Sequence, residues 1–228
     1  MIFTDRDEAG RLLAKKLAFL ADIRNAVVLA LPRGGLPVGF AVAAELGLPL
    51  DVFIVRKIGV PGHEELAMGA IASGGTVIVN SDVVRMLHID RETFKRAADR
   101  ESIELERREK SYRGNKPSFD GRGKVCVLVD DGIATGASML AAAQALRAQN
   151  PQQIIVSAPV AAVGAERQFG AAADRVVLLQ TPADFFAVGA WYETFPQLTD
   201  SEVHDILQRA ELLQFNFTAE DDPRSAHR

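Results

Sequence analysis

Two adjacent acids followed by small and hydroxyl residues are the part of the chain best suited to chemistry. Asp130 and Asp131 precede the segment 132–138, which reads G-I-A-T-G-A-S. Small residues let backbone N–H groups approach an anion closely, and Thr135 and Ser138 add hydroxyl donors. The acids would repel a phosphate, but they can accept hydrogen bonds from vicinal sugar hydroxyls or face a cation. The pattern therefore indicates a ribose 5-phosphate site.

The elements around this segment are those that would position it. Residues 125–129, V-C-V-L-V, form a continuous apolar run typical of a parallel strand covered on both faces. Residues 137–148 are strong helix formers, so the turn opens a helix whose N-terminus favours negative charge. An ordinary strand-to-helix connection with Asp131 as the helix N-cap is the simpler alternative. A phosphoacceptor receiver domain would need a third acid and a lysine, which the later predicted strand ends do not offer.

A second predicted strand ends in the sequence P-R-G-G. It begins at Ala26, and its turn holds Pro32, Arg33, Gly34 and Gly35. Arginine supplies a forked cation, and the glycines let the backbone approach a ligand. By itself this pattern is equally typical of a surface turn.

A third predicted strand, residues 50–56, ends at a pair of cations. Arg56 and Lys57 would leave the sheet beside an anion site and favour binding of a diphosphate. A solvated pair of charges is the alternative.

The segment 125–138 resembles the phosphoribosyl pyrophosphate (PRPP) motif of type I phosphoribosyltransferases. The resemblance implies that Asp130 and Asp131 bind the ribose 2′ and 3′ hydroxyls. It also implies a 5-phosphate site made of Ala134, Thr135, Gly136, Ala137 and Ser138. Arg33, Gly34 and Gly35 resemble the pyrophosphate loop of that family, where a peptide before the first glycine can be cis, here between Arg33 and Gly34. Arg56 and Lys57 lie in a V-R-K-x-G segment similar to that of adenine and orotate enzymes.

Residues 60–79 are predicted to form a mobile loop followed by a two-stranded hairpin that turns near Gly74 and Gly75. In the family a flexible loop here closes over the active site. This makes His63, Glu64 and Glu65 candidates for loop catalysis, although each is equally typical of a solvent-facing loop. The charged segment 91–113 is predicted to be a long helix.

Two short predicted strands, residues 153–157 and 175–179, flank a predicted helical stretch at 165–173 and continue the alternation of strand and helix. The segment 182–193 that follows is rich in aromatic residues. Its F-x-V-G sequence is similar to the hood of hypoxanthine-type enzymes, which implies that Phe186 stacks on a base. The resemblance also implies that Glu193, together with Asp131, meets a metal ion. Core packing is the alternative for the other aromatic residues here.

Composition limits the fold class. The chain has 228 residues, of which 48% are hydrophobic, and this is enough apolar material to bury a substantial core. Its net charge is −4. We expect an α/β fold with a central, mainly parallel sheet and helices on both faces. We expect one domain over residues 1–213, with an inserted loop, hairpin and charged helix at 58–116, a C-terminal hood and helix at 181–213, and a polar tail at 214–228.

Composition also narrows the partners. The acidic balance argues against a nucleic-acid surface, and the single Cys126 excludes a disulfide within the chain or a cysteine zinc site. No apolar run is long enough to span a membrane, and a cytoplasmic location is expected. The apolar seam of the charged helix can dock on the main sheet or on a second subunit, and docking within the chain is the simpler alternative. A homodimer is therefore one open assembly.

These features predict an Mg²⁺-dependent phosphoribosyltransferase that transfers the 5-phosphoribosyl group of PRPP to a nitrogenous base and releases pyrophosphate. The acceptor is left open. Ala134 stands where 6-oxopurine enzymes carry an aspartate, and A-T-G is similar to adenine enzymes, whereas the hood is similar to hypoxanthine enzymes. Two other functions stay open. One is a non-catalytic PRPP-sensing regulator, and the other is a PRPP-directed phosphosugar hydrolase that activates water with Glu64 or Glu65.

Overall fold

The computed structural model describes residues 1–114 and 116–220, with residues 214–220 described by their backbone alone. The α-helices are α1 (Arg6–Lys16), α2 (Gly35–Leu46), α3 (Ser81–Met86), α4 (Arg91–Arg113), α5 (Ala137–Arg147) and α6 (Asp200–Glu220). The strands are β1 (Ala26–Ala30), β2 (Leu50–Val52), β3 (Val55–Val60), β4 (His63–Ala72), β5 (Thr76–Val79), β6 (Val125–Val129), β7 (Gln153–Val160) and β8 (Arg175–Gln180). Short 3₁₀ turns are η1 (Ala18–Leu20), η2 (Ala165–Gln168), η3 (Gly170–Ala172) and η4 (Val188–Trp191).

The main sheet has five parallel strands in the order β2-β1-β6-β7-β8. The chain leaves β1 toward one edge of the sheet and later returns to β6 on the other side of β1. Strand order therefore reverses between β1 and β6, and in open α/β sheets ligands bind at such a point, outside the carboxyl ends of the strands.

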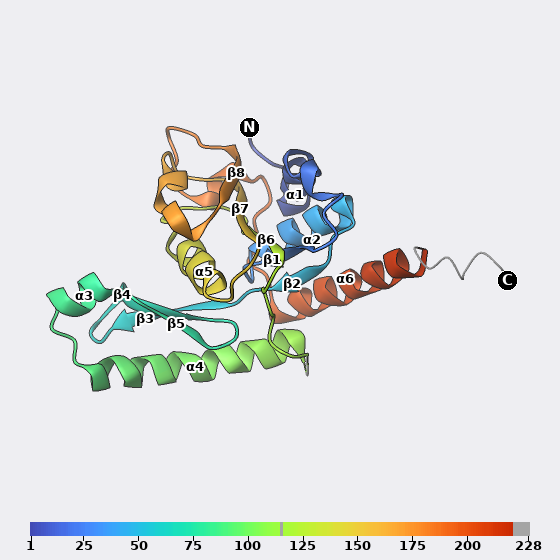
Figure 1. Ribbon diagram of the computed structural model, residues 1–228. Coiled ribbons are helices and arrows are strands. Elements are labelled where there is room, and N and C mark those ends of the chain that lie inside the picture. The colour runs from blue at the N-terminus through green and yellow to red at the C-terminus, as the bar shows by residue number, and fades with distance from the viewer. Residues whose placement is uncertain (115, 221–228) are drawn as a thin grey trace.

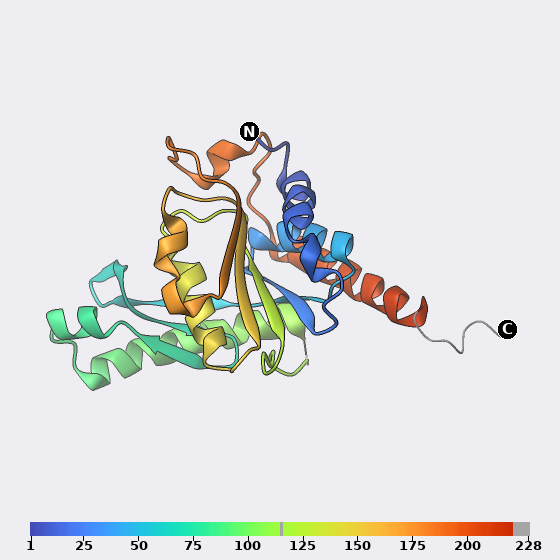
Figure 2. The ribbon, with the colours of Figure 1, turned by 45° about the horizontal axis from the view of Figure 1, so that its top comes forward.

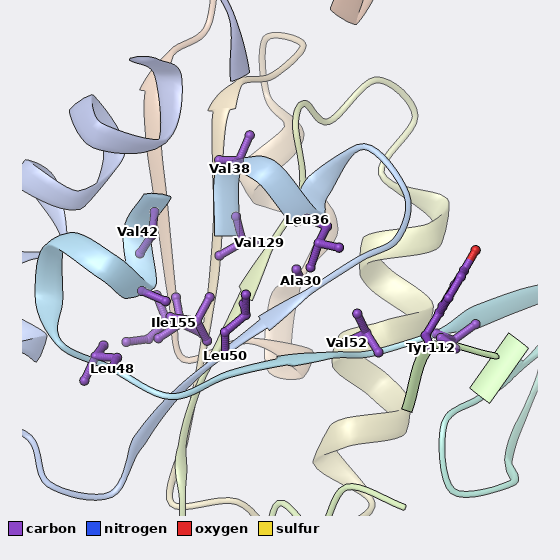
Figure 3. Packing of buried hydrophobic residues seen from close by; sticks show 14 of the residues in the cluster. Ala30, Leu36, Val38, Val42, Leu48, Leu50, Val52, Tyr112, Val129 and Ile155 are labelled. Carbon is purple, nitrogen blue, oxygen red and sulfur yellow. The ribbon is translucent and has the colours of Figure 1, made fainter. Parts of the chain in front are cut away.

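Helices cover both faces of this sheet, as Figures 1 and 2 show, with α1 and α2 on one side and α5 on the other. Alternate residues of a strand point to opposite faces. Val127 and Val129 accordingly pack in the cluster that contains α1 and α2, while Cys126 and Leu128 pack with α5. Figure 3 shows part of the first cluster, where α2 side chains such as Val38 lie close to Val129. The predicted fold class is confirmed.

A second, antiparallel sheet of β3, β4 and β5 extends from the main body, with α4 running along it (Figure 1). Helix α4 contacts β3 and β4, and α5 contacts the same sheet. Strands β4 and β5 form the predicted hairpin, whose turn contains Gly74 and Gly75 with φ of 82° and 76°. Positive φ is the reason that glycine fits both positions.

Several predicted boundaries were wrong. Residues 50–56 are not one strand, because β2 ends at Val52 in the main sheet and β3 begins at Val55 in the small one. The predicted mobile loop is the β3–β4 hairpin, which turns at Pro61 and Gly62. The predicted helical stretch at 165–173 holds two short 3₁₀ helices, η2 and η3.

The chain's last helix extends farther than predicted. The backbone of α6 runs to Glu220, into the segment predicted as a polar tail, and residues 221–228 lie outside the described residues. No helix within the described ranges is long and apolar enough to cross a membrane.

Candidate functional site

The turns that follow β1 and β6 meet at the point where strand order reverses. Ala30 is paired with Val129 at the carboxyl ends of the two strands. The turn with Arg33, Gly34 and Gly35 therefore lies beside the turn that begins with Asp130. The main sheet brings together two motifs that are about a hundred residues apart in the sequence.

The turn after β6 forms a cradle of free donors. Ala134 and Thr135 are exposed, and their N–H groups, like that of Gly136, donate to no other group within the described part of the chain. Gly136 has φ of 71° and is the N-cap of α5, so Asp131 is not that cap. A cavity of about 180 Å³ lies against this turn, lined by residues 132–139 together with Asp130 and Val188. Free N–H groups at a helix N-terminus are suited to a phosphate.

Burial disfavours the charged form of both acids, and the fold compensates this only in part. Burial, and then the neighbouring Asp131 charge, raise the pKa of Asp130 well above its ordinary value. Burial also raises the pKa of Asp131, although Arg6 opposes this shift. The backbone N–H of Asp131 donates to Oδ1 of Asp130 over 2.9 Å. Hydroxyl donors or a cation from a ligand would favour the ionised form of such a pair.

Arg6 is a site residue that the sequence analysis missed. Its Nε donates to Oδ2 of Asp131 over 2.9 Å, and the two side chains are only 9% and 14% exposed. The pairing joins positions 125 residues apart. No local signal in the charged N-terminal segment marks this arginine, because its neighbours are also charged and only the tertiary fold buries it.

The glycines of the β1 turn permit close packing against the acids. A Cβ on Gly34 would lie 2.1 Å from Oδ2 of Asp131, and one on Gly35 would lie 2.6 Å from the Val129 carbonyl oxygen. Only glycine fits at such distances. The cis peptide is Pro32–Arg33, one residue earlier than predicted. The Arg33 side chain is 36% exposed, and its Nη1 lies 3.7 Å from Oδ1 of Asp200 at the start of α6.

Arg56 and Lys57 point to opposite faces of β3, as neighbours in a strand must. Lys57 lines a cavity of about 500 Å³ between the small sheet and α5, together with Ala137 and Ser138 of the cradle. Arg56 instead pairs with Glu101 of α4 at 2.7 Å. Of the two predicted cations, the structure brings only Lys57 beside the cradle. Both lie inside β3, not at a strand end as predicted.

The predicted loop residues are the exposed first residues of β4. Glu65 contacts Nζ of Lys57 at 3.3 Å, and Glu64 lies 3.7 Å from Nη2 of Arg100. Neither these glutamates nor His63 is among the residues that line the cradle cavity. Their position on a strand differs from the mobile loop that motivated a catalytic role.

The hood contributes an apolar side chain and a buried tyrosine. Val188 lines the cradle cavity, and the hydroxyl of Tyr192 donates to the Asp131 carbonyl oxygen over 2.5 Å. Phe186, predicted to stack on a base, is 93% exposed. Glu193 is exposed, and its backbone N–H donates to the carbonyl oxygen of Phe3. The described residues contain no group of three His, Cys, Asp or Glu side chains that could hold a metal ion.

The amino-acid sequence of the chain matches the model of a known protein family. The model of the phosphoribosyl transferase domain matches residues 5–193. The chain belongs to this family. The matched residues include the turns after β1 and β6, the small sheet and the hood as far as Glu193. The match confirms the family that the PRPP motif indicated.

Individual relatives agree with this assignment. Two Mycobacterium tuberculosis proteins, from strains CDC 1551 / Oshkosh and ATCC 25618 / H37Rv, carry the provisional name phosphoribosyl transferase, and each is 46% identical over 209 residues. That alignment covers 92% of this chain but 47% of each relative, so the chain spans about half the length of these proteins. The crystal structure of TT1426 from Thermus thermophilus is 43% identical, has a TM-score of 0.82, and is covered over 99% of its chain and 92% of this one.

Proposed function

We propose that the protein is an Mg²⁺-dependent phosphoribosyltransferase that transfers the 5-phosphoribosyl group of PRPP to a nitrogenous base and releases pyrophosphate. The observation that carries the proposal is the junction of the two turns. Gly34 and Gly35 pack directly on the acid pair, and the acid pair leads into a cradle of free N–H groups. Groups suited to a phosphate and groups suited to a diol are thus adjacent, as a phosphorylated ribose would require.

Each end of PRPP has matching groups in this arrangement. The 5-phosphate would accept hydrogen bonds from residues 134–138, and the ribose hydroxyls would donate to Asp130 and Asp131. The diphosphate would lie toward Arg33 and Lys57, whose side chains are 36% and 43% exposed. These cations would stabilise the negative charge that grows on the leaving pyrophosphate in the transition state more than the charge of bound PRPP. This difference would lower the barrier.

The transfer exchanges one bond for another at C1 of the ribose. A ring nitrogen of the base forms a bond to C1 while the bond from C1 to the pyrophosphate oxygen breaks. The electron pair of that bond leaves with pyrophosphate, and the proton of the base nitrogen passes to solvent. The acid pair lies beside the ribose, where its negative charge suits a positive charge that develops on the ring.

Magnesium fits the chemistry of this donor set. Mg²⁺ prefers carboxylate and phosphate oxygens and keeps several water ligands. The carboxyl of Asp130 has a raised pKa and no ion-pair partner within the described residues, so a nearby cation would favour its ionised form. When bound with PRPP, the metal would neutralise diphosphate charge. Asp130 and Asp131 are the residues proposed to face it, with Glu193 as a further candidate.

A panel of bases tests the activity directly. Purified protein is incubated with PRPP and Mg²⁺, with and without adenine, hypoxanthine, guanine, uracil or orotate, and pyrophosphate release is measured. Release that depends on one base supports transfer and names the acceptor. Turnover without any base would instead support a hydrolase, and binding without turnover would support a PRPP-sensing protein. Phe186→Ala tests whether the exposed ring stacks on the base that is found.

The proposal also covers the location, the assembly and the partners of the protein. We expect a cytoplasmic homodimer that binds PRPP and a small base, without nucleic acid or membrane. Light scattering at several protein concentrations measures the assembly, and a constant monomer mass would contradict the expected dimer.

A further inference from the structure

Strand β5 is the outer strand at one edge of the small sheet. It is the last strand in the order β3-β4-β5, and its sequence, T-V-I-V, contains no charged residue. Val77 and Val79 are 41% and 48% exposed. Proteins commonly protect an edge strand with charged side chains or proline, and β3 carries Arg56 and Lys57 at the other edge. An apolar edge that lacks this protection favours pairing with a further strand.

The hydrogen bonds between β4 and β5 determine which main-chain groups of β5 point outward. The N–H of Asn80 donates to the carbonyl oxygen of Met68 over 2.9 Å. In the alternating pattern of an antiparallel pair, Ile78 then also directs its main-chain groups toward β4. Val77 and Val79 direct theirs away, and within the described residues they hydrogen-bond to no other element. Both valines thus offer a donor and an acceptor to another strand.

A groove runs beside this edge, on the face of the small sheet that α4 covers. Its volume is about 530 Å³, and it is lined by Val77 of β5 and by Arg91, Glu92, Phe94, Lys95, Ala98 and Asp99 of α4. Phe94 and Ala98 are partly buried and pack against the larger core cluster. The groove therefore brings apolar side chains from the core to the surface next to the free edge.

The charged residues of the groove are balanced in sign. Arg91 and Lys95 are cations, and Glu92 and Asp99 are anions. Among the described residues, only Glu92 of these four has an ion-pair partner, which is Arg96 at 3.9 Å. Arg91 begins α4, and Asp99 follows about two turns later. A second copy of the helix running in the opposite direction would therefore bring unlike charges together, so this surface complements itself.

We propose that β5 pairs with β5 of a second copy of the chain, in antiparallel orientation about a two-fold axis at Ile78. This register joins Val77 of each copy to Val79 of the other and uses every outward main-chain group of the two valines. The two small sheets become one continuous sheet, and an isologous contact of this kind closes after two copies. The inference rests on the homodimer of the proposed function, but not on its chemistry.

A cysteine at the proposed axis tests the contact directly. Ile78→Cys should form a covalent dimer under mild oxidation, because opposed residues of a non-hydrogen-bonded pair have Cα atoms about 4.5 Å apart, which a disulfide can bridge. The natural Cys126 is buried, and burial raises its pKa to about 12, so it should not react. Leu66→Cys is the matched control, since Leu66 is 39% exposed but lies in the inner strand β4. An Ile78→Cys variant that crosslinks no better than this control would overturn the proposal.

Sedimentation equilibrium measures the same contact without a crosslink. Val77→Lys places two like charges near the axis and should raise the dissociation constant of the dimer by about tenfold or more. Val77→Thr keeps a β-branched residue at this position and should retain the dimer. Thermal unfolding of both variants checks that they are folded. If Val77→Lys does not fold, the Ile78→Cys crosslink decides.

A charge reversal tests the antiparallel arrangement of the two α4 helices. Arg91→Glu alone should weaken the dimer, because it places an acid near Asp99 of the second copy. Adding Asp99→Arg restores unlike charges across the axis and should recover much of the affinity. A double variant that associates no better than Arg91→Glu would overturn this arrangement.

The outcomes separate the contact from the assembly. Wild-type protein that stays monomeric at every concentration would overturn both the proposed dimer and this contact. A stable dimer that Val77→Lys does not weaken and Ile78→Cys does not trap would overturn the contact alone. Neither measurement uses PRPP, so a failure of the proposed activity would leave both results unchanged.

Discussion

Gly34 lies directly against the carboxylate of Asp131, so that a Cβ at this position would stand 2.1 Å from Oδ2. The two residues come from different strands and different motifs, one following β1 and the other following β6. Their contact is the point where the diphosphate side and the ribose side of the proposed site are joined. The alignment of these two sides therefore depends on the absence of a side chain at Gly34.

A methyl group at Gly34 should damage the site more than the fold. In Gly34→Ala the carboxylate must move, and the move breaks its 2.9 Å contact with Arg6. We expect PRPP affinity to fall by at least tenfold, with a loss of stability of about 1–3 kcal/mol from overpacking. Calorimetric titration measures the first quantity and urea unfolding the second. Wild-type affinity in this variant would show that the contact does not align the site.

Asp130→Asn should stabilise the protein at neutral pH. The pKa of Asp130 is raised in the folded state, so the stability it contributes is present below the unfolded pKa of about 3.9 and is lost as pH rises through the folded pKa. Asparagine removes this loss and can still accept from the N–H of Asp131. We expect a gain in stability at pH 7 that disappears near pH 4, together with weaker PRPP binding. Urea unfolding at both pH values measures it.

The neighbouring substitution supplies the control for this prediction. Asp131→Asn leaves the buried guanidinium of Arg6 without its ionic partner, which costs stability. It should therefore be less stable than Asp130→Asn at pH 7. Equal stabilisation by both substitutions would contradict the different environments of the two acids.

Lys57 tests the diphosphate side of the proposed site, and the neighbouring Arg56 is the control. Lys57→Ala should weaken PRPP binding roughly tenfold, because this side chain lines the cavity next to Ser138. Arg56→Ala should instead lower stability by about 1 kcal/mol or less through loss of the partly exposed pair with Glu101, with PRPP affinity unchanged. Titration and urea unfolding of both variants test the assignment. The reverse pattern would place Arg56 at the site.

Gly132 and Val188 couple the cradle to the hood. A Cβ on Gly132 would lie 2.5 Å from Cγ1 of Val188, so Gly132→Ala should displace the hood and weaken PRPP binding. Adding Val188→Ala creates room and should restore much of the affinity. A double-mutant cycle measures this recovery, since residues in contact have non-additive effects. Strictly additive effects would refute the coupling.

The sequence predicted the central strands and the cradle because their signals are local. The apolar run 125–129 and the small residues after it are readable without knowing what packs around them. The resemblance to the family implied that both turns serve one site, but their direct contact is set by the observed neighbouring of β1 and β6. Both motifs lie within the residues that the family model matches.

Features that depend on tertiary contacts were not predicted. In the sequence, Arg6 cannot be distinguished from the other charged residues of a solvated helix. Its contact with Asp131, 125 residues away, is seen only in the folded chain. The segment 50–56 was predicted to be one strand, but it divides between two sheets after Val52. Once β3 is known to continue through Val60, the alternation of strand side chains explains why only one of its two cations faces the cradle.

The most direct test of the account is calorimetric titration of the protein with PRPP, with and without Mg²⁺. The account predicts saturable binding that depends on Mg²⁺ and is strongly weakened in Asp130→Asn, a variant expected to be more stable than wild type, so that lost binding cannot be attributed to unfolding. Folded wild-type protein that binds no PRPP in either condition would contradict the phosphoribosyl site.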